Sequence, residues 1–163
     1  MQIAPIPKDE VNRLKAVRGL GILDTIKEKR FDDITKDAAE KLCVPISAIS
    51  IVDEGREWHK ACYGIDVREG GRDISFCGHT LVESSDILVV EDTLKDERFS
   101  DNPYVISEPF VRFYAGVRLF DLKTRQPIGV FCVKDKKPRK LSVDELATVL
   151  DYAAKAEEEI NKQ

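Results

Sequence analysis

The stretch Ile46-Ser-Ala-Ile-Ser-Ile-Val52 decides the fold of this chain, together with the Asp53-Glu-Gly-Arg56 segment that follows it. The first segment is a β-branched run of strand length, and the second has the composition of a hairpin turn. Residues 57–63 supply a partner strand. Its side chains are predicted to divide between two faces, with Trp58, Lys60 and Cys62 on one and His59, Ala61 and Tyr63 on the other. The sequence therefore predicts an antiparallel hairpin over residues 46–63.

Further strands are predicted downstream. Residues 111–122 and 128–135 have strand composition, and Lys123-Thr-Arg-Gln-Pro127 joins them as a long hairpin. Residues 87–90 form a short buried strand. Between residues 92 and 109 no hydrophobic period holds and turn-forming residues predominate. A long irregular segment of this kind is often a binding loop.

Helices are predicted near both ends of the chain. Apolar residues at helical spacing mark residues 9–23 and 26–43. The apolar faces consist of Val11, Leu14 and Val17 in the first helix and Phe31, Ile34, Ala38 and Leu42 in the second. Thr25 with Glu28 has the spacing of a capping box for the second helix, and Ser142 with Glu145 has the same spacing for a last helix that runs to about residue 161.

The middle of the chain is less regular. Gly70-Gly71-Arg72 is predicted to be a flexible approach to Ser75, which caps a short helix over residues 76–82. Helices come first, then strands, an irregular middle, a hairpin and a last helix. This order predicts an α+β fold with an antiparallel sheet rather than a repeated βαβ unit. We expect a single domain over 1–163, with an extended arm (1–7), N-terminal helices (8–43), sheet and lid (44–141) and a C-terminal helix (142–162).

Composition excludes several classes of protein. The chain has 163 residues, with 26 basic and 30 acidic side chains and a formal charge of −4, which argues against a dedicated nucleic-acid binder. No apolar run approaches the length of a membrane span, and the N-terminus does not have the pattern of a signal peptide. The four cysteines form no CxxC pair. We therefore expect a cytoplasmic protein with reduced thiols and no membrane partner.

Eight segments, in order, resemble the GAF family of small ligand-sensing domains, which are related to PAS domains. They are Arg18–Thr25, Phe31–Ile34, Val44–Ser47, Ser50–Asp53, Ser75–His79, Arg98–Pro103, Val111–Gly116 and Ile128–Asp135. Together they extend over nearly the whole chain. The subgroup that the chain most resembles is found at the N-terminus of bacterial sensor histidine kinases and diguanylate cyclases.

The resemblance implies a five- or six-stranded antiparallel sheet with terminal helices on one face and a lid on the other. The lid would consist of the helix over 76–82 and the loop over 92–110, and would roof a ligand pocket. The resemblance also implies a non-catalytic sensory role, with an effector domain such as a kinase or diguanylate cyclase elsewhere in a longer protein. Family members bind different ligands or none, so the small molecule and any cofactor stay unidentified.

Ten residues of the lid and the facing strand are the candidate ligand-binding set. They are Phe76, Cys77, His79, Thr80, Asp92, Arg98, Phe99, Asn102, Phe113 and Tyr114. Aromatic and apolar groups with a few placed polar ones are typical of a small-molecule pocket. For each residue a structural role is the alternative, either in core packing or in capping a turn. Because neighbours on a strand point to opposite faces, only one of Phe113 and Tyr114 can face the pocket.

Cys77 and His79 have alternative functional interpretations. As metal ligands they are only a CxH pair, short of a structural site, so no metal is expected. A covalent bilin is a further alternative, since chromophore-bearing GAF domains attach one through a Cys-His pair, but Gly78 separates the two residues here. The chain has no P-loop, GxSxG, HExxH or GxGxxG motif. Because the chain has four thiols, an enzyme similar to free methionine sulfoxide reductase, which has the GAF fold, is an alternative function.

Two features bear on partners. In the last helix, Val143, Leu146, Leu150, Ala153 and Ile160 recur at close to 3.5 residues, the coiled-coil period. The helix thus either packs on its own sheet or also pairs with a second copy, and we expect a homodimer through the terminal helices. A ligand-free dimerisation module is an alternative function. The basic run Lys134, Lys136, Lys137, Arg139 and Lys140 forms either a solvated loop or a contact for an anionic partner.

Overall fold

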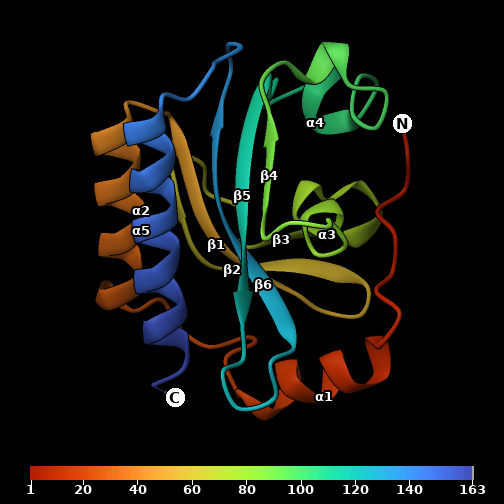
Figure 1. The fold of residues 1–163 in the computed structure, drawn as a ribbon, viewed down its shortest axis with the longest axis vertical. Coiled ribbons are helices and arrows are strands. Elements are labelled where there is room, and N and C mark those ends of the chain that lie inside the picture. Colours follow the sequence, from red (N-terminus) through yellow and green to blue (C-terminus); the bar gives the residue numbers. More distant parts are fainter. Residues whose placement is uncertain (163) are drawn as a thin grey trace.

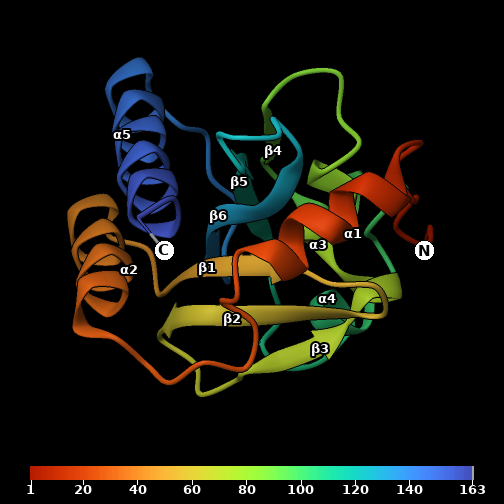
Figure 2. The ribbon, with the colours of Figure 1, turned by 90° about the horizontal axis from the view of Figure 1, so that it is seen from below.

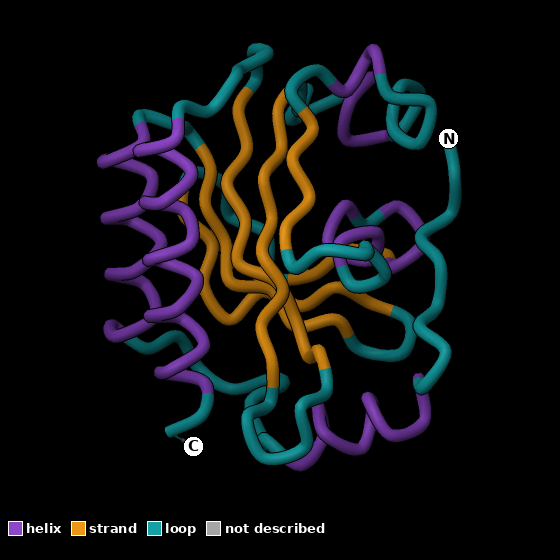
Figure 3. The backbone as a smooth tube through the Cα atoms, viewed as in Figure 1, coloured by secondary structure: helices purple, strands orange, loops and turns teal. Residues whose placement is uncertain are grey.

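The computed structural model describes residues 1–162 and is built around a six-stranded antiparallel sheet with strand order β3-β2-β1-β6-β5-β4 (Figures 1 and 3). The strands are β1 (Ile46–Val52), β2 (Arg56–Tyr63), β3 (Glu69–Gly71), β4 (Ile87–Val90), β5 (Phe113–Phe120) and β6 (Pro127–Asp135). The α-helices are α1 (Glu10–Gly19), α2 (Lys29–Leu42), α3 (Phe76–Thr80), α4 (Pro103–Ile106) and α5 (Val143–Ile160). The predicted α+β class, the antiparallel sheet and both hairpins are confirmed.

One face of the sheet carries α2 and α5, which lie side by side (Figures 1 and 2). Phe31 and Ala38 of α2 and Val149 and Ala156 of α5 are fully buried there against sheet residues such as Phe131. Burying a large apolar side chain contributes about 1.5–3 kcal/mol, so this layer supplies much of the folding free energy. We call it the helix face. No helix within residues 1–162 is long and apolar enough to cross a bilayer.

The opposite face, here called the lid face, is covered by α3, α4 and the loops between them (Figure 1). The N-terminal arm runs across the outside of this lid. The Gln2 amide donates to the Arg98 carbonyl over 3.1 Å, and the Ala4 amide donates to the Asp73 carbonyl over 3.1 Å. Two separate segments of the lid are thus tied to one strand-like arm. The two faces of the sheet therefore bury different layers, with paired helices on one side and short loop-borne elements on the other.

The predicted alternation of side chains between the two faces of β2 is wrong, because the strand contains a β-bulge. Ile49 pairs with Ala61, but the next residue, Ser50, pairs with His59, so the register passes over Lys60. An extra residue in one strand of an antiparallel pair shifts all later side chains to the other face. Ala61 consequently packs in the helix-face core with Trp58, whereas Cys62 packs on the lid face.

The approach to α2 also differs from the prediction. Thr25 does not cap this helix. Its hydroxyl donates to the Ile22 carbonyl and accepts from Lys60 Nζ, and α2 begins at Lys29, with Glu28 as the N-cap residue. The Glu28 carboxylate lies 2.7 Å from the fully buried Lys60 ammonium. The Glu28 side chain therefore pairs with the buried Lys60 ammonium instead of completing a capping box.

Three smaller expectations were also wrong. Val11 is exposed while Leu14 and Val17 are buried, because α1 contacts the end of the sheet along a narrow face. Gly70 and Gly71 belong to the short edge strand β3, which pairs with the start of β2, rather than to a flexible approach. Helix α3 ends at Thr80, two residues earlier than expected, although the Ser75 cap is present, with the Gly78 amide donating to Ser75 Oγ over 2.9 Å.

The last helix starts with the predicted capping box between Ser142 and Glu145. Its predicted coiled-coil seam, however, is divided. Ala153 and Ile160 are buried in the protein's own core, while Val143 and Leu150 are exposed. An apolar stripe that is exposed throughout instead consists of Val143, Ala147, Leu150 and Ala154. Its steps of four, three and four residues are those of a heptad seam.

Candidate functional site

Five of the predicted site residues meet beneath the lid. Phe76, Cys77, Thr80, Phe99 and Tyr114 are each at most 1% exposed. The Phe76 ring stacks on Phe99 at a centroid distance of 4.5 Å and on Tyr114 at 5.1 Å. The hydroxyl oxygens of Thr80 and Tyr114 are 2.7 Å apart, which satisfies both buried polar groups. The rings of Phe76, Phe99 and Tyr114 thus form an aromatic wall that joins α3 to the loop and to β5.

His79 connects this aromatic wall to the arm. Its ring packs edge-on against Phe99 at 4.8 Å, and its Nε2 lies 3.1 Å from the Gln2 carbonyl oxygen. Burial lowers the pKa of His79, although the contact with Gln2 opposes that shift. The imidazole is therefore mostly neutral near pH 7 and holds the arm by a hydrogen bond rather than by its charge.

The predicted polar loop residues hold the lid in shape. The Asp92 carboxylate accepts from the Leu94 amide and from Arg112, and Arg98 pairs with both Asp96 and Glu83. Asn102 caps α4 through its side-chain oxygen and donates from Nδ2 to the Ile74 carbonyl over 3.0 Å. These contacts join the loop to Ile74 before α3, to Glu83 after α3 and to Arg112 just before β5. Their observed partners are all within the protein, so a direct role in ligand contact stays a prediction.

Phe113 and Tyr114 face opposite ways, as strand geometry requires. Tyr114 belongs to the apolar cluster under the lid, while Phe113 is buried in the helix-face core. Nine of the ten predicted site residues thus belong to the lid or face it. Phe113 is held on the other side of the sheet.

The lid face also buries a set of polar residues, of which only Cys77 belongs to the predicted site. They lie on β2, α3 and β6, and we call them the lid-side polar cluster: Glu57, His59, Cys62, Cys77, Cys132 and Lys134. Glu57 is 3% exposed and its Oε1 has no hydrogen-bond partner within the described residues. His59 Nδ1 lies 2.9 Å from Ser50 Oγ. Lys134 is 8% exposed, and its ammonium lies 5.7 Å from the centre of the Phe76 ring.

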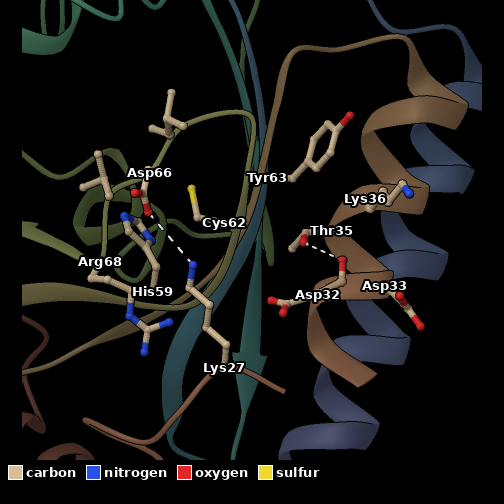
Figure 4. Close-up of a pocket in the computed structure, with 12 residues that line it drawn as sticks. Lys27, Asp32, Asp33, Thr35, Lys36, His59, Cys62, Tyr63, Asp66 and Arg68 are labelled. Carbon is tan, nitrogen blue, oxygen red and sulfur yellow. Dashed lines mark hydrogen bonds and ion pairs between the residues drawn. The ribbon is translucent and has the colours of Figure 1, made fainter. Parts of the chain in front are cut away.

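A pocket of about 270 Å³ reaches this cluster from outside, beside the part of β2 that β3 leaves unpaired (Figure 4). His59 and Cys62 form its inner wall. Arg68 and Asp66 from the loop after β2 lie on one side, and the start of α2, including Asp32, lies on the other. Side chains of both charge signs thus surround the opening. Within residues 1–162 no group of three or more His, Cys, Asp or Glu side chains is arranged to hold a metal ion.

Comparison with solved structures identifies this architecture. The GAF domain of an Acinetobacter phosphoenolpyruvate-protein phosphotransferase superposes with a TM-score of 0.68 over 96% of this chain and 95% of that one, at 19% identity. The chain has the GAF-domain fold. A type II free methionine-R-sulfoxide reductase from Thermoplasma acidophilum has the same GAF fold, with a TM-score of 0.66 over 90% of this chain and 96% of that one, at 13% identity.

At the level of sequence, the GAF chain is similar to part of a cyclic di-GMP phosphodiesterase from Pseudomonas aeruginosa. The two are 36% identical over 155 residues, which is 95% of this chain and 26% of the relative. The chain thus spans about a quarter of the length of that protein. No family model matches the sequence.

The lid-side polar cluster of this GAF fold contains buried charges that influence one another. Burial alone would raise the pKa of Glu57, but the positive charges of Lys134 and His59, together with hydrogen bonds from Cys77 and Ser75, lower it below its usual value, so Glu57 is ionised. Burial opposes the charge on Lys134 as well, yet the surrounding Cys132 and Glu57 raise its pKa. Burial raises the pKa of Cys62 to about 12, which keeps this thiol protonated. Two opposite charges are therefore maintained in a buried layer.

The alternation of side chains along β6 is the sequence signal from which the burial of Lys134 could have been predicted. Val130, Cys132 and Lys134 occupy every second position of a buried strand, so their side chains share one face of the sheet. The expectation for the basic run was instead a solvated loop or a contact for an anionic partner. Lys136 and Lys137 are exposed after the end of β6, but Lys134 lies within the strand and points beneath the lid. Glu57 carried no such signal, because its burial depends on how β3 and α4 fold over it.

Proposed function

We propose that the chain is a non-catalytic sensory GAF domain that binds a small molecule beneath the lid and transmits binding through its terminal helices. The observation that carries this proposal is the pair of buried charges, Glu57 and Lys134, on the lid face. Burying an ionised group costs several kcal/mol unless it is paired and hydrogen-bonded, and Glu57 Oε1 has no partner in the described chain. A ligand that supplies the missing contacts offsets this cost.

In this proposal the lid face binds the ligand, and the helices on the opposite face of the sheet transmit the signal. The lid is made of short elements held by hydrogen bonds and ion pairs, and such loop-rich regions open at lower free energy than core strands and helices. The opposite face carries α2 and α5 on the same strands. A ligand that binds the closed lid more tightly than the open lid shifts that equilibrium and, through β1 and β6, biases how the helices pack.

The partner domain is proposed from the sequence relative. Because the similar protein from Pseudomonas aeruginosa is a cyclic di-GMP phosphodiesterase of which this chain spans about a quarter, we place the domain in a longer cytoplasmic protein of cyclic-dinucleotide or sensor-kinase signalling. The exposed stripe on α5 is the surface through which two copies would pair.

Thermal-shift screening of the domain against a library of metabolites, nucleotides and cyclic nucleotides tests the proposal. We expect a subset of chemically related compounds to raise the melting temperature, because a ligand that binds only the native state stabilises it. If no compound raises the melting temperature while the domain dimerises at low micromolar concentration in sedimentation, the alternative of a ligand-free dimerisation module is favoured. A strict monomer at that concentration would exclude this alternative.

A thiol enzyme that reduces small sulfoxides is the second candidate, favoured by one observation. Cys77 of α3 lies against Cys132 of β6, and hydrogen bonding from the Cys77 thiol lowers the pKa of Cys132. In such a reaction two thiols would become a disulfide while the sulfoxide oxygen leaves as water. Burial keeps Cys77 and Cys62 protonated, however, so neither is a ready nucleophile. Sulfoxide turnover with a thioredoxin-type reductant, lost in Cys77→Ser, would establish the enzyme.

A further inference from the structure

The N-terminal arm lies along the outside of the lid (Figure 1) and is bonded to three separate parts of it. The Gln2 amide donates to the carbonyl of Arg98, in the loop before α4. The Ala4 amide donates to the carbonyl of Asp73, just before α3. The Gln2 carbonyl oxygen lies 3.1 Å from His79 Nε2, within α3 itself. One short segment of backbone therefore connects the loop, the approach to α3 and α3.

The arm also fits α3 through a contact between Ala4 and Gly78. Ala4 is 5% exposed, and a Cβ added at Gly78 would approach the Ala4 Cβ to 2.7 Å, well inside the usual contact distance of carbon atoms. The same Cβ would meet Arg72 and Ser75 only at 3.4 and 3.6 Å. Gly78 has no left-handed backbone conformation that would require glycine. The arm is thus the neighbour that a side chain at this helical position would displace.

The contacts that hold the arm are few. Ile3 and Ile6 are 64% and 61% exposed, so the large apolar side chains of the arm do not anchor it. Pro5 and Pro7 restrict the backbone of the arm, which lowers the entropy lost when it docks. A segment held by a small number of hydrogen bonds opens at lower free energy than a buried core helix. The arm can therefore detach while the rest of the fold stays intact.

The first turn of α1, which follows the arm, is bonded to the start of the lid as well. The Glu10 carboxylate accepts from the guanidinium of Arg72, which is 4% exposed. Arg72 also donates to the Asp53 carbonyl over 3.1 Å, which fixes it at the turn between β1 and β2. Both the arm and α1 thus contact the lid. A movement of the lid reaches α1 directly, without passing through the sheet.

We propose that the N-terminal arm is a strap that holds the lid closed, so that the lid opens when the arm detaches from α3. This goes beyond the sensory function proposed above, because it connects the lid to α1 rather than to α2 and α5 through the sheet. A ligand that binds only beneath the closed lid strengthens docking of the arm, and by linkage a detached arm weakens that ligand by the same factor. The strap itself needs no ligand.

Moving one methyl group between Gly78 and Ala4 tests the strap on the domain without ligand. Gly78→Ala should displace the arm, and Ala4→Gly in the same chain should make room for the added methyl group. NMR amide exchange, expressed as protection factors, is measured at residue 4 and in α3. We expect Gly78→Ala to lower both protection factors at least tenfold and the double variant to restore them to within threefold of the wild type. Ile3→Ala, at an exposed position of the same arm, is the control and should change neither.

The direction of the change separates the strap from a passive arm. Alanine favours a helix more than glycine does, so without the strap Gly78→Ala should slow exchange in α3, and that result would overturn the proposal. Faster exchange that Ala4→Gly does not reverse, or faster exchange at residue 4 alone, would also overturn it. Should circular dichroism show that Gly78→Ala is unfolded, Ala4→Asp places a charge in the same contact and is expected to speed exchange at both places. Small-molecule sensing is decided separately, by the thermal-shift screen.

Discussion

Glu57 of β2 and Lys134 of β6 are buried on the same face of one sheet, carry opposite charges and, among the described residues, form no ion pair with each other. Both are nine-tenths or more buried, and each is charged at neutral pH. A protein that needed only stability would have apolar residues at these positions, since such replacements are often neutral or stabilising. The pair thus has the character of a functional element retained at a cost in stability.

Replacing both charges tests this cost. The double variant Glu57→Gln, Lys134→Met should be at least as stable as the wild type at pH 7, while each single variant should be less stable than the double because one buried charge is left without its counterpart. We expect a coupling of about 1 kcal/mol, measured by urea unfolding of all four proteins. Strictly additive losses, with the double variant the least stable, would mean that each charge is already satisfied.

Gly70 allows Tyr104 to close over the sheet. A Cβ at Gly70 would collide with the Tyr104 hydroxyl, whereas a Cβ at the neighbouring Gly71 would meet its nearest atom only at 4.0 Å. Gly70→Ala should therefore cost about 1 kcal/mol by overpacking and speed amide exchange of α4, with Gly71→Ala as the matched control. Equal exchange rates of α4 in the two variants would show that Tyr104 does not fasten the lid.

Glu10 should make stability depend on pH at the acid end. Burial alone would raise its pKa, but hydrogen bonds from Arg13 and Arg72 lower it from 4.5 to about 2. A depressed carboxyl pKa contributes stability that is complete above pH 4.5 and is lost as pH falls towards 2. Glu10→Gln should cost about 2 kcal/mol at pH 7 and progressively less between pH 4.5 and 2, compared with the exposed control Glu97→Gln. A pH-independent difference in urea unfolding would refute the assignment.

The exposed stripe on α5 predicts dimerisation. Val143 is 85% exposed and Leu150 is 43% exposed, and an apolar stripe at heptad spacing is stabilised by pairing with a second copy. Leu150→Glu should weaken self-association at least tenfold in sedimentation. Lys155→Gln lowers the net charge by the same amount from an exposed position outside the stripe and should not. If both variants associate like the wild type, α5 is not the dimer surface.

The fold was predictable because its strongest signals are local. The β-branched run before Asp53, the Pro127 hairpin and the Ser142 capping box each determine structure from adjacent residues, and all three are confirmed. The errors arose at residues whose structure is determined by a contact with a residue far away in the sequence. Thr25 and Glu28 have capping-box spacing, but the buried Lys60 ammonium engages both side chains.

The candidate site was predictable only in its apolar part. Phe76, Phe99 and Tyr114 were expected at one site because the resemblance to the GAF family implies a lid over the sheet, and their rings do lie together. Glu57 and Lys134 were missed because a charge is normally exposed, and their burial depends on the sheet order β2-β1-β6, which joins segments far apart in the chain. The bulge at Lys60 likewise depends on pairing with β1.

Amide hydrogen exchange of the lid, with and without a saturating compound that raises the melting temperature of the domain, measures the central claim most directly. Binding beneath the lid predicts at least tenfold slower exchange in α3 and α4, with smaller changes in α2 and α5. Unchanged exchange in α3 and α4, despite binding detected by calorimetry, would contradict the account, because the ligand would then lie outside the layer that the lid encloses.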